Sequence, residues 1–477
     1  MRGGSITAVK EYDVIVIGGG PAGENAADLA GRTGLKVALV EAELVGGECS
    51  YWACMPSKAL LRPGEVVDAA GRTPGVVGAA IDAEAALARR DALASHWDDH
   101  GQVEWLDSVG VDLIRGRGRL EGVKTVEVEH PDGTRSTYRA SVAVVVATGT
   151  RALVPPIEGI EQAWDTRHVT TARRVPRRLL VVGGGVAGVE MAQAWRTLGA
   201  EQVTVVELQD RLLPGEEPFA GEELAAQFAR DGIEVLVSAR VTRLARTDDE
   251  GAFRVEVESS GNRREIEADE VAVAVGRRPN TDDIGLETVG LEPGGFLDVD
   301  DRLRVTGVEG GWLYAVGDVN GRALLTHSGK YQARIAGAYI AGLEETRAWA
   351  DQTANPRVVF THPQVAAVGL TEAAARDQGL EVRTVTYDTG QVAGSATLGE
   401  GYRGTAKLVV DSARQVVVGA TFVSPVAGEM LHAATIAVVA EVPLGKLWHA
   451  IPAFPTVSEV WLRLLEAYRD EYGHTFV

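Results

Sequence analysis

The chain has 477 residues, of which 47 are Lys or Arg and 67 are Asp or Glu, giving a formal net charge of −20. Its length suggests about three domains at roughly 150 residues each, and its composition is that of a folded globular protein. The acidic charge disfavours nucleic acid and anionic lipid as partners. The sequence has no membrane span and no apolar core of a signal peptide, so we expect a cytoplasmic protein.

The first predicted unit is a buried strand, a glycine turn and a helix, in the segment YDVIVIGGGPAGENAADLA. Gly18, Gly20 and Gly23 form the G-x-G-x-x-G pattern, which allows a tight turn, close approach of a pyrophosphate and helix–strand packing. Glu41 ends the next predicted strand, where it can accept hydrogen bonds from ribose hydroxyls. This segment therefore predicts a dinucleotide site.

The pattern returns at Gly183, Gly185 and Gly188, and Glu207 again ends the following strand. An isolated glycine motif is weak evidence because such turns also serve plain packing, but two complete copies predict two bound dinucleotides. A carboxylate at Glu207 disfavours a 2′-phosphate, so NADH is favoured over NADPH, although Arg211 nearby moderates this preference.

The only two cysteines are Cys49 and Cys54. Two cysteines are too few for a disulfide framework or a structural zinc site, and we expect no bound metal. A continuous helix would separate them by roughly 7.5 Å along its axis, which is long for a disulfide. We therefore expect Cys49 in a turn before the helix, allowed by Gly46 and Gly47. The pair is interpreted as redox-active rather than as two buried inert thiols.

The sequence resembles the flavoprotein disulfide reductases, the family of dihydrolipoamide dehydrogenase, glutathione reductase and mercuric reductase. The resemblance spans almost the whole chain. It is carried by segments in the family's order: GGGPAG, GGECSYWACMPSK, VVVATGT, GGGVAGVE, VAVGRRPN, LYAVGDVNG, FTHPQVAAVG and FPTVSE. It implies an α/β protein with two Rossmann-like dinucleotide-binding domains and an α+β C-terminal dimerisation domain.

The resemblance also implies the cofactors and their ligands. FAD would be bound in the first motif region, and a nicotinamide dinucleotide, NAD(P)H, in the second. The implied FAD residues are Gly18, Gly20, Gly23, Glu41, Gly47, Lys58, Thr148, Gly149, Gly317 and Asp318. The implied nicotinamide residues are Gly183, Gly185, Gly188 and Glu207, and Gly276 is a further predicted cofactor-binding residue.

Catalytic roles follow from the same resemblance. Cys54 would contact the flavin ring, whereas Cys49 would be the outer thiol that meets the substrate. Lys58 would pair with Glu190 near the flavin N5 edge, where its positive charge stabilises electron density on the reduced flavin.

The predicted domains are an FAD-binding domain at residues 1–155 and 281–353, a nicotinamide domain at 156–280 and an interface domain at 354–477. The resemblance implies a homodimer in which the partner's C-terminal segment completes each active site.

The sequence departs from the family at Phe454. The family's disulfide reductases carry a histidine directly before this Pro-Thr, oriented by a glutamate that is retained here as Glu459. A phenyl ring cannot protonate a leaving thiolate. His449 is the nearest alternative base, and His327 and His362 lie in other matched segments. Within the redox loop, residues 50–53 (SYWA) are expected to make the outer face of the cysteine pair bulkier.

These observations predict an FAD enzyme that passes hydride electrons from NADH to Cys49 and Cys54, and then to a small-molecule acceptor such as a quinone, a metal ion or another electrophile. One alternative is a true dihydrolipoamide dehydrogenase or other disulfide reductase, with protons from water or His449. An alternative of another class is a catalytically vestigial flavoprotein that serves as a binding component.

Overall fold

The computed structural model describes residues 9–246, 251–343, 346–473 and 475–476. The chain divides into two compact units. Unit 1 comprises residues 1–55, 91–153 and 277–352, and unit 2 comprises residues 56–90, 154–276 and 353–477. Each unit is therefore assembled from segments far apart in the sequence.

Unit 1 is built on a seven-stranded sheet with the order β3-β2-β1-β6-β5-β4, in which β16 pairs with the C-terminal end of β6, beyond the stretch that pairs with β5. The strands β3, β2, β1, β6 and β16 run parallel, and their apolar side chains are buried on both faces, as expected for a parallel sheet. The strands are β1 (Lys10–Ile17), β2 (Val37–Glu41), β3 (Val111–Arg115), β4 (Arg117–Leu120), β5 (Thr125–Glu129), β6 (Arg135–Val146) and β16 (Leu313–Ala315).

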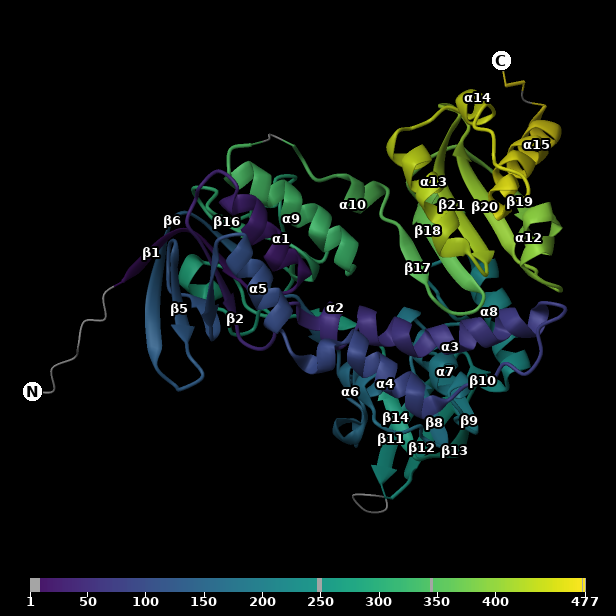
Figure 1. The fold of residues 1–477 in the computed structure, drawn as a ribbon, viewed down its shortest axis with the longest axis horizontal. Helices are drawn as coiled ribbons and strands as arrows, with labels where there is room; N and C mark the ends of the chain where they lie inside the picture. The colour runs from purple at the N-terminus through teal and green to yellow at the C-terminus, as the bar shows by residue number, and fades with distance from the viewer. Residues whose placement is uncertain (1–8, 247–250, 344–345, 474, 477) are drawn as a thin grey trace, which may run out of the picture. The chain divides into compact units, whose positions relative to one another are not determined.

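Two helices of unit 1, α1 and α9, lie side by side against this sheet (Figure 1). Small residues permit their close approach, since a Cβ added at Gly337 of α9 would lie 2.6 Å from the Leu29 Cβ of α1. A short antiparallel pair joins β7 to β15. These elements, with the remaining helices near this unit, are α1 (Pro21–Gly31), α2 (Gly47–Tyr51), α5 (His100–Ser108), α9 (Thr326–Ile340), α10 (Ala350–Thr353), β7 (Thr150–Ala152) and β15 (Arg277–Pro279).

Unit 2 contains a four-stranded parallel sheet, β10-β9-β8-β14, and an antiparallel meander, β11-β12-β13. Most of helix α7 is buried, including Trp195 near its C-terminal end. The strands are β8 (Arg178–Val182), β9 (Gln202–Val206), β10 (Ile233–Leu236), β11 (Ala239–Arg246), β12 (Phe253–Ser259), β13 (Asn262–Ala268) and β14 (Glu270–Val273). The helices are α3 (Cys54–Arg72), α4 (Ala83–Leu93), α6 (Thr166–Thr171), α7 (Val186–Thr197) and α8 (Pro218–Asp231).

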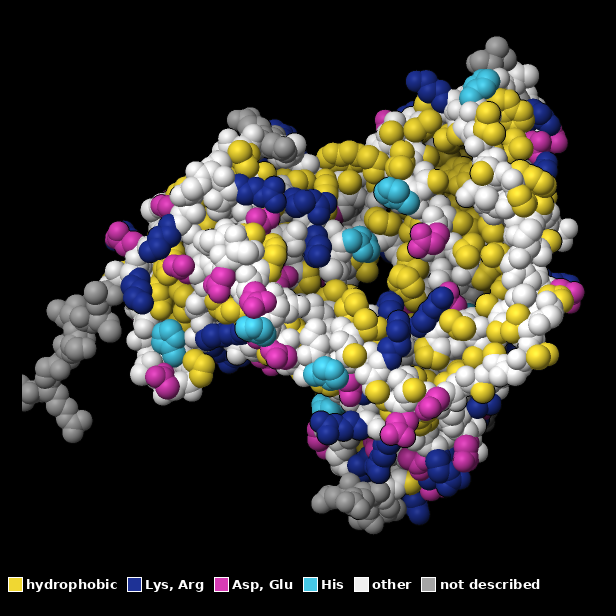
Figure 2. All heavy atoms as spheres, in the orientation of Figure 1, with side chains coloured by type: hydrophobic (Ala, Val, Ile, Leu, Met, Phe, Trp, Pro, Cys, Tyr) yellow, Lys and Arg dark blue, Asp and Glu magenta, His cyan; other side chains and the backbone are white. Residues whose placement is uncertain are grey.

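The C-terminal part of unit 2 is a five-stranded antiparallel sheet, β17-β18-β21-β20-β19, packed against α13 and α15. Hydrophobic side chains gather on the surface of this region (Figure 2), including Ile436, Ile451 and Phe454. The strands are β17 (Arg357–Val359), β18 (Gln364–Gly369), β19 (Val382–Asp388), β20 (Thr405–Asp411) and β21 (Val416–Ser424). The helices are α11 (Glu372–Asp377), α12 (Ala393–Leu398), α13 (Ala427–Val439), α14 (Leu444–Leu447) and α15 (Val460–Tyr472).

The predicted fold class is confirmed, because two strand–turn–helix units with parallel sheets precede an α+β region at the C-terminus. The four-part domain boundaries expected from the sequence remain a prediction.

Candidate active site

The first glycine motif forms the turn between β1 and α1. Gly18 has a φ of 104°, and a Cβ there would lie 2.4 Å from the Ala147 carbonyl oxygen, so only glycine fits. A Cβ at Gly23 would lie 1.9 Å from the Gly18 carbonyl oxygen. The N-cap residue Gly20 makes no side-chain capping bond. The first-turn N–H groups of α1 therefore suit a pyrophosphate.

Glu41, at the end of β2, is held by backbone donors from both sides. Its Oε2 accepts from the Gly19 N–H at 2.6 Å, and its Oε1 accepts from the Glu43 N–H at 2.6 Å. Burial raises the pKa of Glu41, whereas these two hydrogen bonds lower it. The carboxylate is thus fixed beside the glycine turn.

The second motif has the same construction. Gly183 has a φ of 108° and lies against the Ala274 carbonyl, and a Cβ at Gly188 would lie 1.9 Å from the Gly183 carbonyl oxygen. Gly185 caps α7 without a side-chain bond. The Glu207 carboxylate accepts from the N–H groups of Gly184 at 2.5 Å and Gln209 at 2.7 Å.

Asp318 of unit 1 lies in a cluster of polar side chains with Thr150 and Arg277. Its Oδ2 accepts from the Thr150 hydroxyl at 2.8 Å, and the Arg277 Nε, which donates to the same hydroxyl at 2.6 Å, lies 3.9 Å from that oxygen. Burial raises the pKa of Asp318, whereas Thr150 and Arg277 lower it. Sequence reasoning missed Thr150 and Arg277, although Thr150 follows Gly149 directly and Arg277 lies in the matched segment VAVGRRPN.

The other predicted cofactor glycines have positive φ angles that favour glycine: Gly149 at 66°, Gly276 at 132° and Gly317 at 79°. Thr148 is held by its neighbour Asn280, whose amide donates to the Thr148 carbonyl at 2.9 Å. Gly47 lies against the first motif, because a Cβ there would be 2.8 Å from the Gly20 Cα. Gly276 belongs to unit 2, and the others belong to unit 1.

The cysteine pair spans the break between two helices. Cys49 lies inside the short helix α2, and Cys54 is the first residue of α3. Cys49 therefore precedes the helix that begins at Cys54, as expected, but it lies in a separate short helix and not in a turn. Because α2 ends at Tyr51, no continuous helix holds both cysteines. The two thiols interact directly, and this hydrogen bond, followed by burial, raises the pKa of Cys49.

Helix α9 contributes a residue that sequence reasoning missed. Thr326, the first residue of α9, places its Oγ1 3.4 Å from the Cys54 Sγ. Thr326 and Lys330, one turn further along α9, both lower the pKa of Cys49 and so oppose the effect of burial. No motif in the sequence signalled this role, because both residues lie just beyond the matched segment LYAVGDVNG.

The redox loop is less bulky toward solvent than residues 50–53 suggest. Tyr51 is buried, its hydroxyl donates to the Val45 carbonyl at 2.9 Å, and its ring contacts that of Trp52 edge-on. The expectation that Tyr51 enlarges the outer face is wrong, because its hydroxyl finds a partner inside the core.

Lys58 and Glu190 are brought together in unit 2. The Lys58 Nζ donates to Glu190 Oε2 at 2.7 Å, while the Phe360 N–H donates to Oε1 at 2.9 Å. The Lys58 ammonium also lies 4.8 Å from the Phe360 ring centroid. Both oxygens of this buried carboxylate are therefore satisfied, and Phe360 is a contact that sequence reasoning missed.

Phe454 and Glu459 differ sharply in exposure. Phe454 is 75% exposed, whereas Glu459 is 7% exposed. The Glu459 Oε1 accepts from Arg463 Nη2 at 2.6 Å, but its buried Oε2 has no hydrogen-bond partner among the described residues. Glu459 is the residue that the resemblance identifies with the glutamate orienting the family's histidine.

The alternative histidines differ from one another in burial. His449 and His327 are exposed, whereas His362 is buried and burial lowers its pKa. Among the described residues, no cluster of three or more His, Cys, Asp or Glu side chains could hold a metal ion. No helix in the described ranges is long and apolar enough to cross a membrane.

Two family profiles match the chain. One, described as pyridine nucleotide-disulphide oxidoreductase, matches residues 12–342, and the other, its dimerisation domain, matches residues 355–465. Enzymes of this family use FAD and NAD(P)H, and the two glycine turns with Glu41 and Glu207 fit two dinucleotides. The dimerisation domain supports a homodimer.

Individual relatives agree with this assignment. The chain is 34% identical over 478 residues to a dihydrolipoyl dehydrogenase of Thermus scotoductus, covering 98% of this chain and 99% of the relative. It is 31% identical over 459 residues to a mercuric reductase of Staphylococcus aureus, covering 94% and 81%.

Solved structures are similar over nearly the whole length. LpdA from Mycobacterium tuberculosis matches with a TM-score of 0.84 at 28% identity, covering 96% of this chain and 99% of that chain. The copper(II) complex of the flavoprotein disulfide reductase RclA from Escherichia coli matches with a TM-score of 0.82 at 25% identity and the same coverage. The chain belongs to the pyridine nucleotide-disulphide oxidoreductase family, as an FAD-dependent oxidoreductase.

Proposed function

We propose that this enzyme takes electrons from NADH through FAD to the Cys49–Cys54 pair and delivers them to a quinone, a metal ion or another electrophile, rather than to a simple disulfide. The observation that carries this proposal is Phe454 beside a half-satisfied Glu459. Reduction of a disulfide releases a thiolate that must be protonated, and a positioned acid typically contributes about 10²–10⁴-fold to such a step. Phe454 offers no proton.

Cys54 is proposed as the inner thiol, at the flavin, and Cys49 as the outer thiol, at the acceptor. Bound FAD would supply the hydride acceptor and the electron relay between the nicotinamide and the cysteines. In the proposed cycle, the cysteine disulfide gains two electrons and two protons to become a dithiol. The dithiol then re-forms the disulfide and releases two electrons and two protons. A quinone takes up both, whereas with one Hg(II) or two Cu(II) ions as acceptor the electrons go to the metal and the protons go to solvent. Thr326 contacts Cys54, the proposed inner thiol, and its hydroxyl can donate to a thiolate there.

Lys58 is proposed to act electrostatically at the flavin N5 edge. Because Glu190 is satisfied by both Lys58 and the Phe360 N–H, the lysine is held in one orientation. A fixed positive charge stabilises developing negative charge without transferring a proton.

The names of two relatives favour a metal ion among the possible acceptors. One relative is a mercuric reductase, and one structural neighbour was solved as a copper(II) complex. A metal ion accepts electrons without needing a proton, which suits a site without the histidine.

Dihydrolipoamide dehydrogenase activity is the second candidate, favoured by the 34% identity to a dihydrolipoyl dehydrogenase. Water or the exposed His449 would then supply protons. In a homodimer of either enzyme, the partner's C-terminal segment is proposed to complete the site, and a cytoplasmic location remains part of the proposal.

An acceptor screen under a steady supply of NADH tests this function. Lipoamide, glutathione disulfide, quinones, Cu(II) and Hg(II) would be compared at equal enzyme concentration. We expect readily measured quinone or metal-ion reduction and slow disulfide reduction. Lipoamide turnover with kcat near or above about 10² s⁻¹ would establish the second candidate instead. No oxidation of NADH with any acceptor would indicate a vestigial enzyme.

The nicotinamide preference needs its own measurement. Because the Glu207 carboxylate would repel a 2′-phosphate, we expect kcat/KM with NADH to exceed that with NADPH. Glu207→Gln should narrow the gap, whereas Glu201→Gln, an exposed change on the same unit, should not. Equal or better use of NADPH by the unaltered enzyme would contradict the role of Glu207.

A further inference from the structure

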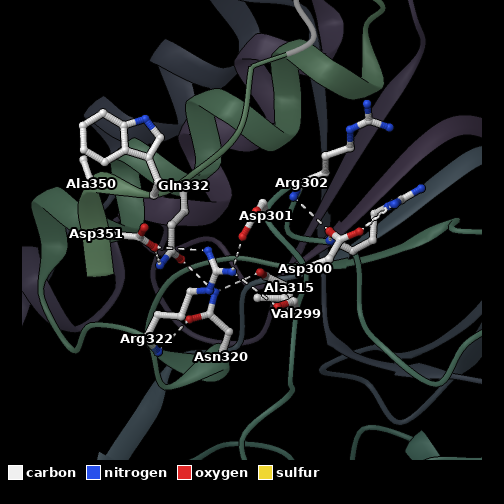
Figure 3. Close-up of polar contacts among 12 residues, drawn as sticks. Val299, Asp300, Asp301, Arg302, Ala315, Asn320, Arg322, Gln332, Ala350 and Asp351 are labelled. Carbon is white, nitrogen blue, oxygen red and sulfur yellow. Dashed lines mark hydrogen bonds and ion pairs between the residues drawn. The ribbon is translucent and has the colours of Figure 1, made fainter. Parts of the chain in front are cut away.

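Unit 1 holds a buried polar network (Figure 3). It joins Gln332 of α9, Asp351 of α10, Asn320 at the end of the 3-10 helix that begins at Asp318, and Arg322 of the loop that follows. Gln332 is fully buried, and the Asp351 side chain has no exposed area. Such groups are costly to bury unless they are paired, so their arrangement needs a reason.

The hydrogen bonds of the network have one consistent direction. The Gln332 Nε2 donates to Asp351 Oδ2 at 2.8 Å. The amide oxygen of Gln332 therefore faces away from Asp351, and it accepts from the Gly317 N–H at 2.8 Å and from Asn320 Nδ2 at 2.8 Å. Because a carboxylate is only an acceptor, Asp351 dictates which end of the Gln332 amide meets Gly317.

The Gly317 peptide sets the direction of Asp318. Gly317 has φ 79° and ψ −159°, a backbone conformation that is accessible essentially only to glycine. A Cβ there would lie 2.9 Å from the Ala22 Cβ of α1. The next residue, Asp318, directs its carboxylate to the Thr150 hydroxyl. The hydrogen bond from the Gly317 N–H to Gln332 therefore fixes the backbone of this turn immediately before Asp318.

The network is not optimised for stability alone. The Arg322 Nη1 lies 3.6 Å from Asp351 Oδ2, too far for a hydrogen bond. Both Arg322 Nη1 and Asp351 Oδ1 are buried without a hydrogen-bond partner among the described residues. A buried ion pair is weak evidence for stability, and such pairs can instead specify one conformation. Asp351 also lies between the two matched family regions, which end at residue 342 and begin at residue 355.

We propose that Asp351 and Gln332 are positioning residues for FAD, which act through the Gly317 peptide to hold Asp318 in its cofactor-binding orientation. This inference rests on the family's use of FAD and not on the identity of the acceptor. It assigns a function to a carboxylate that none of the predicted site residues includes.

Exchanging the donor and the acceptor tests the proposal. Gln332→Glu retains an acceptor for Gly317 but places a carboxylate against Asp351, and Asp351→Asn removes the charge that orients Gln332. The double variant Gln332→Glu/Asp351→Asn restores one donor, one acceptor and the original net charge. We expect Gln332→Glu to raise the dissociation constant for FAD by at least about fivefold, and the double variant to recover most of that loss.

The readout is titration of each apoprotein with FAD, followed by flavin fluorescence and the visible spectrum, with the melting temperature of each apoprotein measured in parallel. Tyr12→Phe is the control, because it removes a hydrogen bond to Asp112 in the same unit and should leave FAD affinity unchanged. The proposal would be overturned if the losses of FAD affinity in the two single variants simply added in the double variant. It would also be overturned if all variants bound FAD with equal affinity. If the apoprotein of Gln332→Glu does not fold, recovery of folding and FAD binding by the double variant supports the pairing, and failure of that recovery contradicts it.

Discussion

Two buried carboxylates of unit 2, Glu190 and Glu459, occupy contrasting environments. Glu190 receives Lys58 on one oxygen and the Phe360 N–H on the other. Within the described part of the chain, Glu459 receives only Arg463 and leaves one buried oxygen without a hydrogen-bond partner. The residues proposed for the flavin side are therefore fully paired, while the C-terminal segment retains a carboxylate without the imidazole that would use it. This contrast is what the proposed function requires, in which electron entry is preserved and proton delivery to the acceptor has changed.

The largest expected effect concerns the thiols, because both the proposed flavin side at Glu190 and the proposed acceptor side at Glu459 depend on them. Cys54→Ser should abolish the long-wavelength absorption of the two-electron-reduced enzyme, because a thiolate must contact the flavin ring to give that band. Cys49→Ser should keep or strengthen it. Anaerobic titration with NADH, followed by absorbance, measures both. The reverse pattern would exchange the two roles.

The next prediction restores an imidazole at position 454 and concerns the rate of disulfide reduction. Phe454→His should raise the rate with a small disulfide by at least about tenfold, within the range expected of a positioned acid, and change quinone reduction little. The unpartnered Oε2 of Glu459 is available to orient the new ring. Steady-state rates with lipoamide and with a quinone provide the comparison.

Two further variants separate a gain of chemistry from a gain of space. Phe454→Leu should give no increase, and Phe454→His/Glu459→Gln should lose much of the increase seen with histidine alone. An equal gain in the leucine variant would mean that Phe454 acts by obstruction.

The Glu190 side can be tested independently. Lys58→Met removes the charge held by Glu190 and should slow reduction of the flavin by NADH by about tenfold or more, as loss of a preorganised electrostatic contact does. Stopped-flow absorbance measures this half-reaction without any acceptor. Lys36→Met is a control, because it removes a lysine that stacks on Tyr12 instead. An unchanged rate would remove the electrostatic role.

The smallest expected effect concerns Glu24 of α1, which is neither of the two carboxylates compared above. It tests how burial alone changes the pKa of a carboxyl group. Burial raises the pKa of Glu24 from its ordinary value of 4.5 to about 7, against the opposing charge of Lys330. A raised folded-state pKa means that the native protein holds a proton that the unfolded chain releases. Stability of the apoprotein should therefore fall as the pH rises from about 4.5 through about 7.

Glu24→Gln should reduce that fall, shifting the melting temperature at pH 8 upward by on the order of a few degrees relative to its change at pH 5. Asp28→Asn, on the same helix, is the matched charge control. An identical pH dependence in Glu24→Gln and the unaltered apoprotein would contradict the raised pKa.

The sequence by itself determined the parts whose signal is local. Gly23 and Gly188 could be recognised because the carbonyl oxygens of Gly18 and Gly183, within the same strand–turn–helix unit, exclude a Cβ. The replacement at Phe454 was visible from its position beside Pro-Thr. Such patterns depend on neighbours close along the chain, and so they can be read without knowing the tertiary structure.

Only the tertiary structure decided the contacts between distant segments. Thr326 reaches Cys54 across 272 residues of sequence, and the unpaired oxygen of Glu459 becomes apparent only when all surrounding donors are in place. The short helix α2 and the burial of Tyr51 also escaped prediction, since the contact of Tyr51 with Val45 depends on packing of the whole unit. Burial and pairing are properties of the folded chain, and no spacing rule contains them.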